Sequence, residues 1–286
     1  MNGSRTQIIV LSLAALALAQ CAKSDNPPPE YPPLEPSQTA GLETTPDGSH
    51  ERSRKSAPAI AVRAEKRTPI EGETPKLRIT TPKLNATIRD KKVMVRLALT
   101  GWELSPTGNH VHLIVDNLPY IAIRDVSQPL ELEALMQKEL GESLSEGSHT
   151  LRAFPSRGHH ESVKQGSPFA WTVFHLKTKT DLKDFDGKAP LLTYSRPKGC
   201  NPEGKPVLLD FYVTNVPSLS ADGYKVAYTI DGKHTGVITE WAPHYIDNMG
   251  TGKHEIRLVL RDKDNAQVPG PFNDTTRSIE VSKSCP

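Results

Sequence analysis

The sequence repeats itself, and this repeat most limits the folds that the chain can adopt. Three segments recur in the same order: KVMVRLALTG (92–101) as PVLLDFYVTN (206–215), HVHLIVDN (110–117) as KVAYTIDG (225–232), and GSHTLRAF (147–154) as GKHEIRLV (252–259). The first two pairs are separated by about 115 residues. Two copies of one module of about 100 residues therefore account for most of the chain.

Within each copy, apolar residues alternate with other residues, as expected for half-buried β-strands. Val111, Leu113 and Val115 fall on one face of the predicted strand, and His110, His112 and Ile114 on the other. Short alternating segments separated by Asp and Gly turns are typical of a β-sandwich. We therefore predict an all-β chain with two tandem immunoglobulin-like β-sandwich domains, at residues 76–180 and 181–286.

Two features of the copies refine this prediction. Residues 128–143 (QPLELEALMQKELGES) are rich in helix-forming residues and predict a short helix that is absent or shorter in the second copy. A Gly-x-His element places His149 and His254 at the turn into the sixth strand of an immunoglobulin-like sandwich. We interpret both imidazoles as structural groups that bond to the backbone at that corner.

The N-terminus predicts export. Arg5 precedes an apolar run at 8–19 that is too short to span a bilayer as a mature helix. LAQC, which ends at Cys21, resembles a bacterial lipobox, so residues 1–21 are predicted to be a lipoprotein signal peptide with lipidation at Cys21. With no Asp after this cysteine, the anchor is expected in the outer membrane of the cell envelope. The alternative is cleavage after Ala17-x-Ala19, which would yield a secreted or periplasmic soluble protein.

Residues 22–75 are rich in Pro, Ser, Glu and Lys and carry few periodic apolar residues. Such a segment cannot bury enough apolar surface to fold, so we predict a disordered, Pro-rich linker.

The cysteine count agrees with export. If Cys21 carries lipid, Cys200 and Cys285 remain and can form a disulfide in an oxidising compartment. Two reduced thiols are the alternative.

Several segments together resemble those of a family of two-domain bacterial envelope lipoproteins of uncharacterised function, sometimes labelled phosphopeptide-binding. The segments are HVHLIVDNLPY (110–120), FPSRGHHESVK (154–164), LTYSRPKG (192–199), LLDFY (208–212) and VPGPFN (268–273). The resemblance implies the two-domain fold and the location in the cell envelope, and it supplies no binding residue.

Composition and motifs argue against several classes of function. The net charge is only +2, with Lys and Arg scattered among Asp and Glu, so no nucleic acid is expected as a partner. No nucleophile elbow, dinucleotide fingerprint or zinc-protease motif occurs. We therefore predict a non-enzymatic binding or interaction module. It would be held at the membrane by its N-terminal lipid, and an envelope protein, a glycan or an acidic peptide would be its partner.

The histidine-rich loop at 154–164 carries the remaining hypotheses. One is a divalent metal site for Zn²⁺, Cu²⁺ or Ni²⁺; its candidate ligands are His110, His112, His159, His160 and Glu161. Another is an anion or phosphopeptide site; its candidate residues are His110, His112, Arg157, His159, His160 and Lys164. The third hypothesis is a solvated loop whose histidines only pack against the fold. Positions 110 and 112 align with Lys225 and Ala227 in the second copy, so the fold itself does not require the imidazoles.

Aromatic residues offer a further route to a partner. Exposed aromatic side chains would favour a protein or glycan partner, whereas buried ones would indicate packing. The candidates are Trp102, Tyr120, Trp241 and Tyr245.

Overall fold

The structure is a computed structural model that describes residues 58–90, 92–182 and 185–285. The predicted signal peptide, the lipidation site at Cys21 and most of the predicted linker lie outside the described residues. Within the described ranges, no helix combines the length and apolar character needed to cross a membrane.

The first copy of the repeat forms two facing β-sheets. Its strands are β2 (Lys76–Thr81), β3 (Ala86–Ile88), β4 (Met94–Thr100), β5 (His110–Val115), β6 (Ile121–Ile123), β7 (Leu130–Glu131), β8 (Gly147–Ser156) and β9 (Ala170–Leu176). One sheet has the order β2-β4-β7 and the other β3-β9-β8-β5-β6. The helix α1 (Leu132–Leu140) lies within the segment predicted to be helical.

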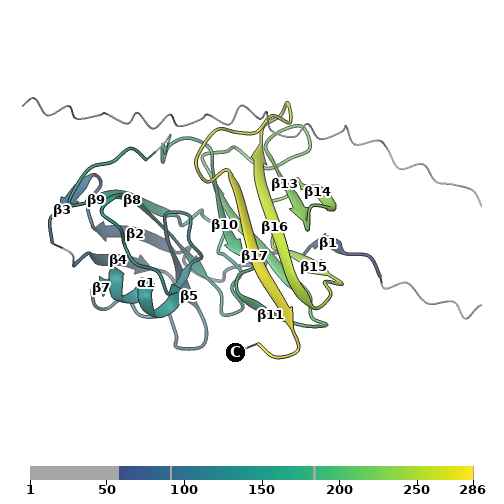
Figure 1. Ribbon diagram of the computed structural model, residues 1–286, viewed down its shortest axis with the longest axis horizontal. Helices are drawn as coiled ribbons and strands as arrows, with labels where there is room; N and C mark the ends of the chain where they lie inside the picture. Colours follow the sequence, from purple (N-terminus) through teal and green to yellow (C-terminus); the bar gives the residue numbers. More distant parts are fainter. Residues whose placement is uncertain (1–57, 91, 183–184, 286) are drawn as a thin grey trace, which may run out of the picture. The chain divides into compact units, whose positions relative to one another are not determined.

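The second copy repeats the same arrangement (Figure 1). Its strands are β10 (Leu191–Arg196), β11 (Cys200–Pro202), β12 (Val207–Thr214), β13 (Lys225–Ile230), β14 (His234–Ile238), β15 (His244–Asp247), β16 (Gly252–Arg261) and β17 (Asp274–Ser282). The sheet orders β10-β12-β15 and β11-β17-β16-β13-β14 match those of the first copy strand for strand. Because both sheet pairs share one topology, the structure confirms the sequence repeat and the all-β sandwich fold.

Each copy has its own apolar core, built by the predicted alternation. Val111, Leu113 and Val115 of β5 are buried in the core of the first sandwich. Ile114, from the opposite face of the same strand, belongs to a separate cluster with Phe154 and with Tyr212 of the second copy. The outer face of this sheet is therefore covered by the other sandwich, and it is not open to solvent.

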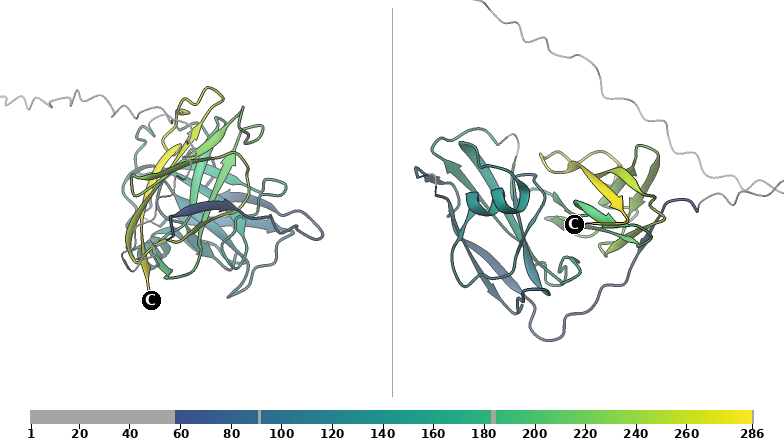
Figure 2. Two further views of the ribbon diagram at one scale, coloured as in Figure 1. Left: turned by 90° about the vertical axis from the view of Figure 1, so that its right-hand side faces the viewer. Right: turned by 60° about the horizontal axis from the view of Figure 1, so that its bottom comes forward.

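A short strand lies inside the range predicted to be disordered. β1 (Ala61–Ala64) pairs antiparallel with β15 and extends a sheet of the second sandwich. The chain then crosses to the first copy through residues 65–75, as the right-hand view of Figure 2 shows. The prediction of a disordered linker up to residue 75 is thus wrong for residues 61–64. Here an exposed sheet edge supplies hydrogen-bond partners that the segment itself lacks.

The two Gly-x-His corners are built alike. His149 Nδ1 lies 2.8 Å from the Asp116 carboxylate, and Nε2 lies 2.8 Å from the Ser145 carbonyl oxygen. His254 makes the same pair of contacts, to Asp231 at 2.7 Å and to a backbone carbonyl at 2.8 Å. The predicted structural role of both imidazoles is confirmed.

The predicted pairing of the two C-terminal cysteines is also confirmed. Cys200 and Cys285 form a disulfide with a Cα–Cα distance of 5.4 Å. The bond ties the C-terminal end of the chain to β11, the short strand that pairs parallel with β17.

Candidate metal site

Two of the candidate histidines lie on one face of β5 and are fully buried. His110 and His112 have no exposed surface. The alternation along this strand places them on the face opposite the core, and the structure shows that this face is buried as well. The face is covered by Tyr120, which stacks on His112 with 3.5 Å between ring centroids, and by Ser195 of β10.

The third histidine reaches the same point from the loop that follows β8. His160 closes a tight turn in which its amide donates to the Arg157 carbonyl oxygen at 2.9 Å. Its φ is +72°, in the left-handed region that residues with a β-carbon seldom adopt. Such a conformation costs about 1–3 kcal/mol and is held only where the surroundings impose it. The turn thus directs the imidazole of His160 toward β5 at an energetic cost.

Three imidazole nitrogens converge. His110 Nε2 lies 3.0 Å from His112 Nε2 and 3.0 Å from His160 Nδ1. One ligand nitrogen from each of the three residues lies within 4.8 Å of the other two. A group of three imidazoles at this spacing can hold a metal ion.

All three imidazoles are held in the neutral form, which is the form that binds metals. Burial lowers the pKa of His110 and lowers the pKa of His112 well below its usual range. Burial, followed by the charge of Arg196, lowers the pKa of His160 to about 3. A neutral imidazole has one nitrogen with a free lone pair, so each ring can offer one ligand atom at neutral pH.

Hydrogen bonds at the far side of two rings fix which nitrogen carries the proton. His110 Nδ1 lies 2.9 Å from the Gly108 carbonyl oxygen, which can only accept, so Nδ1 is protonated and Nε2 bears the lone pair. His112 Nδ1 lies 3.1 Å from the Ser195 hydroxyl. If this nitrogen donates to Ser195, the lone pair of His112 also points into the cluster.

Tyr120 completes the aromatic surroundings. Its hydroxyl lies 3.0 Å from His160 Nδ1, and only 1 % of its surface is exposed. Burial raises the pKa of this phenol to about 12, so it is protonated at neutral pH. Tyr120 is thus a packing residue and not an exposed contact for a partner, because its ring stacks on His112.

Basic side chains surround the cluster. Arg124 donates to the Gly108 carbonyl oxygen at 3.0 Å, on the outer side of His110. Lys198 donates to the Tyr120 carbonyl oxygen at 2.8 Å and stands 4.0 Å from the centroid of the Tyr120 ring. Burial, with a smaller contribution from Arg196, lowers the pKa of Lys198 to about 8. These positive charges oppose a cation at the cluster, so a bound metal ion would need an anion as a further ligand to offset them.

The remaining residues of the predicted metal site lie elsewhere. His159 Nε2 is 3.0 Å from the Glu161 carboxylate, and the His159 side chain is 54% exposed. Neither residue belongs to the cluster of three histidines. Their inclusion in the metal site is corrected, because the turn directs the side chain of His160 inward while His159 stays in solvent.

Two basic residues of the predicted anion site are also occupied. Lys164 is buried and forms an ion pair of 2.5 Å with Asp210 of β12. The Arg157 guanidinium donates to the backbone carbonyl oxygens of Thr68 and Pro69 in the crossing segment. An anion site would need both side chains to be free, but each one links two parts of the fold.

The other candidate aromatics are half-buried. Trp102 donates to the Ser156 carbonyl oxygen at 3.3 Å, and Tyr245 lies beneath Arg63. Trp241 packs edge-on against Tyr212 and keeps part of its surface exposed. Of these four candidates, only Trp241 lines the cavity that is described below.

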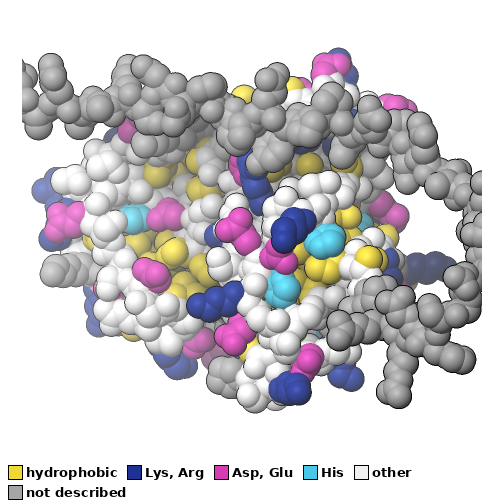
Figure 3. All heavy atoms as spheres, turned by 45° about the vertical axis from the view of Figure 1, so that its right-hand side comes forward, with side chains coloured by type: hydrophobic (Ala, Val, Ile, Leu, Met, Phe, Trp, Pro, Cys, Tyr) yellow, Lys and Arg dark blue, Asp and Glu magenta, His cyan; other side chains and the backbone are white. Residues whose placement is uncertain are grey.

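The surface charges are mixed. Figure 3 shows one face of the molecule, on which Lys and Arg side chains lie among Asp and Glu side chains. Exposed pairs such as Lys263–Asp264, 2.6 Å apart, contribute to this pattern. The described part of this face thus presents both signs of charge in close proximity.

Some residues around the cluster could not be inferred from sequence. Ser195, Arg196 and Lys198 belong to LTYSRPKG (192–199), a segment that contributed only to the family resemblance. They lie against the first copy because of how the two sandwiches pack, and no local pattern encodes that packing.

Comparisons with known proteins add the fold alone. No family model matches the chain, and no curated protein matches it. The fibronectin(III)-like modules of Clostridium thermocellum CbhA share 12% identity over 72% of this chain and 93% of theirs, with a TM-score of 0.26. The CARDB domain of the Pyrococcus furiosus PF1109 protein, solved with di-metal ions, shares 17% identity over 34% of this chain and 97% of its own, with a TM-score of 0.23.

A third solved structure is SGBP-B of a Bacteroides ovatus mixed-linkage glucan utilization locus. It is 14% identical over 74% of this chain and 48% of its own, with a TM-score of 0.22. Likenesses this distant carry no information on what this chain binds.

Proposed function

We propose that this protein is a non-enzymatic, lipid-anchored module of the bacterial cell envelope that binds a divalent transition-metal ion through His110, His112 and His160. The observation that carries the proposal is the convergence of three neutral imidazole nitrogens, with two contacts of 3.0 Å. The envelope location rests on the export signal and the lipobox resemblance.

The cluster is poorly satisfied without an ion. The single lone pair of His110 Nε2 faces two ring nitrogens at hydrogen-bond distance, but it can accept only one well-directed hydrogen bond. A metal ion removes this conflict because it accepts a lone pair from every ring. Metal–nitrogen bonds then offset the cost of burying His110 and His112, of half-burying His160 and of holding His160 at positive φ.

The donor set indicates the class of ion. Imidazole is a borderline ligand that suits Zn²⁺, Cu²⁺ and Ni²⁺. Two nitrogens 3.0 Å apart subtend roughly 90° at an ion about 2.1 Å from each. A modest widening of this nitrogen–metal–nitrogen angle would give a tetrahedral zinc site. The present angle suits the tetragonal geometry of Cu²⁺ or Ni²⁺.

The second copy supports a dedicated site in the first. At the matching positions it carries Lys225 and Ala227. The Lys225 amine contacts the Lys263 carbonyl oxygen at 3.5 Å, so this strand folds without the imidazoles. The histidines of the first copy are therefore not a requirement of the sandwich.

Calorimetric titration of the protein with Zn²⁺, Cu²⁺ and Ni²⁺ tests the proposal. We expect one ion per chain with at least micromolar affinity. His160→Gly removes the imidazole and suits the left-handed backbone, so this variant should lose binding without losing thermal stability. His159→Ala is the matched control from the same loop and should bind as the unmodified protein does. The site would be excluded if His160→Gly and His159→Ala gave equal heat changes, or if no ion gave a heat change with any form of the protein.

A further inference from the structure

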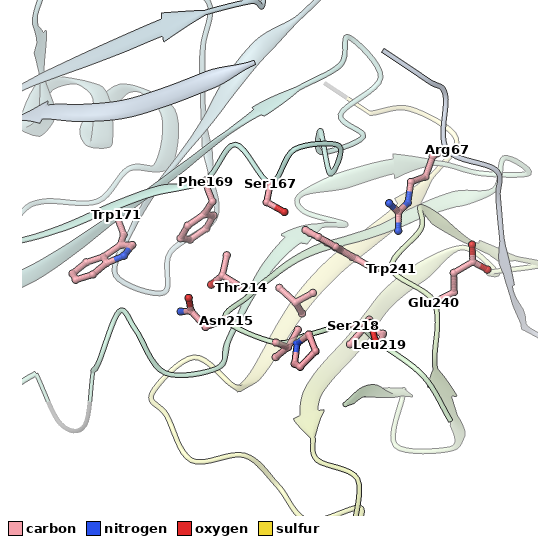
Figure 4. A pocket seen from close by; sticks show the side chains of 13 residues that line it. Arg67, Ser167, Phe169, Trp171, Thr214, Asn215, Ser218, Leu219, Glu240 and Trp241 are labelled. Atoms are coloured by element: carbon pink, nitrogen blue, oxygen red, sulfur yellow. The ribbon is translucent and has the colours of Figure 1, made fainter. Parts of the chain in front are cut away.

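A cavity lies apart from the histidine cluster and is lined in part by aromatic side chains (Figure 4). Its volume is about 520 Å³, within the range of roughly 300–1,000 Å³ that is usual for small-ligand sites. Phe169 and Trp171 of the first copy lie on one side, and Trp241 of the second copy lies on the other.

The aromatic walls are held in place by packing. Phe169 and Trp241 both contact the ring of Tyr212, with centroid distances of 5.2 and 5.0 Å. Trp171 packs against Gly187 so closely that a β-carbon there would come within 2.2 Å of the indole. Because these rings are fixed before any ligand arrives, binding would cost little side-chain entropy.

Polar groups line the floor and rim. Thr214 lines the cavity, and its hydroxyl is buried with no hydrogen-bond partner among the described residues. Asn215 donates from its amide nitrogen to the carbonyl oxygens of Gly187 and Ala189, which leaves its amide oxygen as an acceptor. Glu240 and Arg67 place one charge of each sign at the opposite end.

We propose that this cavity binds a short, neutral oligosaccharide. Flat aromatic rings match the C–H faces of pyranose rings, and fixed amide, hydroxyl and carboxylate groups match their hydroxyls. A purely apolar ligand would leave the Thr214 hydroxyl and the Asn215 oxygen unpaired. An anion would meet the Glu240 carboxylate as well as the Arg67 guanidinium. The proposal does not depend on metal binding.

Intrinsic fluorescence provides a direct test, because the chain has three tryptophans and two of them line the cavity. The purified full-length protein is titrated with cellotetraose, chitotetraose and maltotetraose, with and without a metal chelator. We expect a saturable change in emission with at least one tetrasaccharide, unaltered by the chelator. Trp102 lies outside the cavity lining, so Trp102→Phe should keep the change.

Two variants locate the binding site. Thr214→Val removes a hydroxyl that has no hydrogen-bond partner among the described residues, so we expect an unchanged melting temperature and about threefold to tenfold weaker binding. Trp171→Phe should reduce the emission change and weaken binding. The proposal is overturned if none of the three sugars binds, or if both variants bind them as the unmodified protein does. It is also overturned if a proline-rich peptide of residues 26–37 occupies the cavity instead.

Discussion

The imidazole Nδ1 of His112 lies 3.1 Å from the hydroxyl oxygen of Ser195. The contact joins β5 of the first sandwich to β10 of the second, over a separation of 83 residues. It places a hydrogen-bond partner behind one ring of the proposed metal site. In metal sites such partners set the tautomer and the orientation of the ligand, and their loss usually weakens metal affinity about 10-fold to 100-fold.

Ser195→Ala should therefore weaken metal binding by about tenfold or more while leaving the three imidazoles in place. Competition against a chromophoric chelator measures the affinity. Ser195→Thr keeps the hydroxyl, so this variant should retain most of the metal affinity. Equal affinity in the alanine variant and the unmodified protein would show that Ser195 does not orient His112.

The buried pair formed by Lys164 and Asp210 should be essential to stability. Its side chains are 1% and 0% exposed, and the Ser162 amide and hydroxyl also donate to Asp210. Lys164→Met would leave the carboxylate buried without its counter-charge. We expect the free energy of unfolding in urea to fall by about 3–5 kcal/mol.

The double variant Lys164→Met/Asp210→Asn provides the control for that experiment. It removes both charges and keeps an oxygen to accept from Ser162, so it should recover much of the lost stability. A double variant that is as unstable as the single one would mean that the loss reflects the packing of Lys164.

The corner histidines should give stability a defined dependence on pH. Burial of His149 opposes its charged form, but the Asp116 carboxylate and the Ser145 carbonyl oxygen outweigh burial and raise its pKa. The folded protein therefore binds this proton more tightly than the unfolded chain does. The resulting stabilisation is fully present below pH about 6.5 and is lost as the pH rises through the raised folded pKa.

The variant Asp116→Asn tests the predicted direction of this pH dependence. The stability difference between the unmodified protein and the variant should be largest in acid and should shrink toward alkaline pH. Asp231→Asn, at the His254 corner, should behave in the same way, because Asp231 and the Gly250 carbonyl oxygen raise the pKa of His254 against the effect of burial. Differences that grow with pH would contradict this assignment of charge.

Local sequence patterns predicted the parts of this fold that depend on short-range chemistry. The alternation along residues 111–115 marked the core face of β5, and the Gly-x-His elements marked two structural corners. The matching segments also revealed that one topology occurs twice. Strand periodicity and turn residues report on a residue's immediate neighbours, so these features could be read from the sequence alone.

Features that depend on packing between the two copies could not be predicted. His110 and His112 were assigned to the correct face, but the other sandwich covers that face. Lys164 was a candidate anion-binding residue of the loop at 154–164, but its amine pairs with Asp210, which lies 46 residues away in the sequence. The positive φ of His160 could not be read from the sequence, because only a small fraction of residues with a β-carbon adopt it, even for histidine, which does so more often than most.

The most direct test of the metal site is anomalous X-ray diffraction from crystals grown with Zn²⁺ and recorded on both sides of the zinc absorption edge. We predict a single anomalous peak that lies within bonding distance of His110 Nε2, His112 Nε2 and His160 Nδ1. A peak bound instead by His159 and Glu161, or no peak at the three imidazoles of a zinc-saturated crystal, would contradict the proposed function.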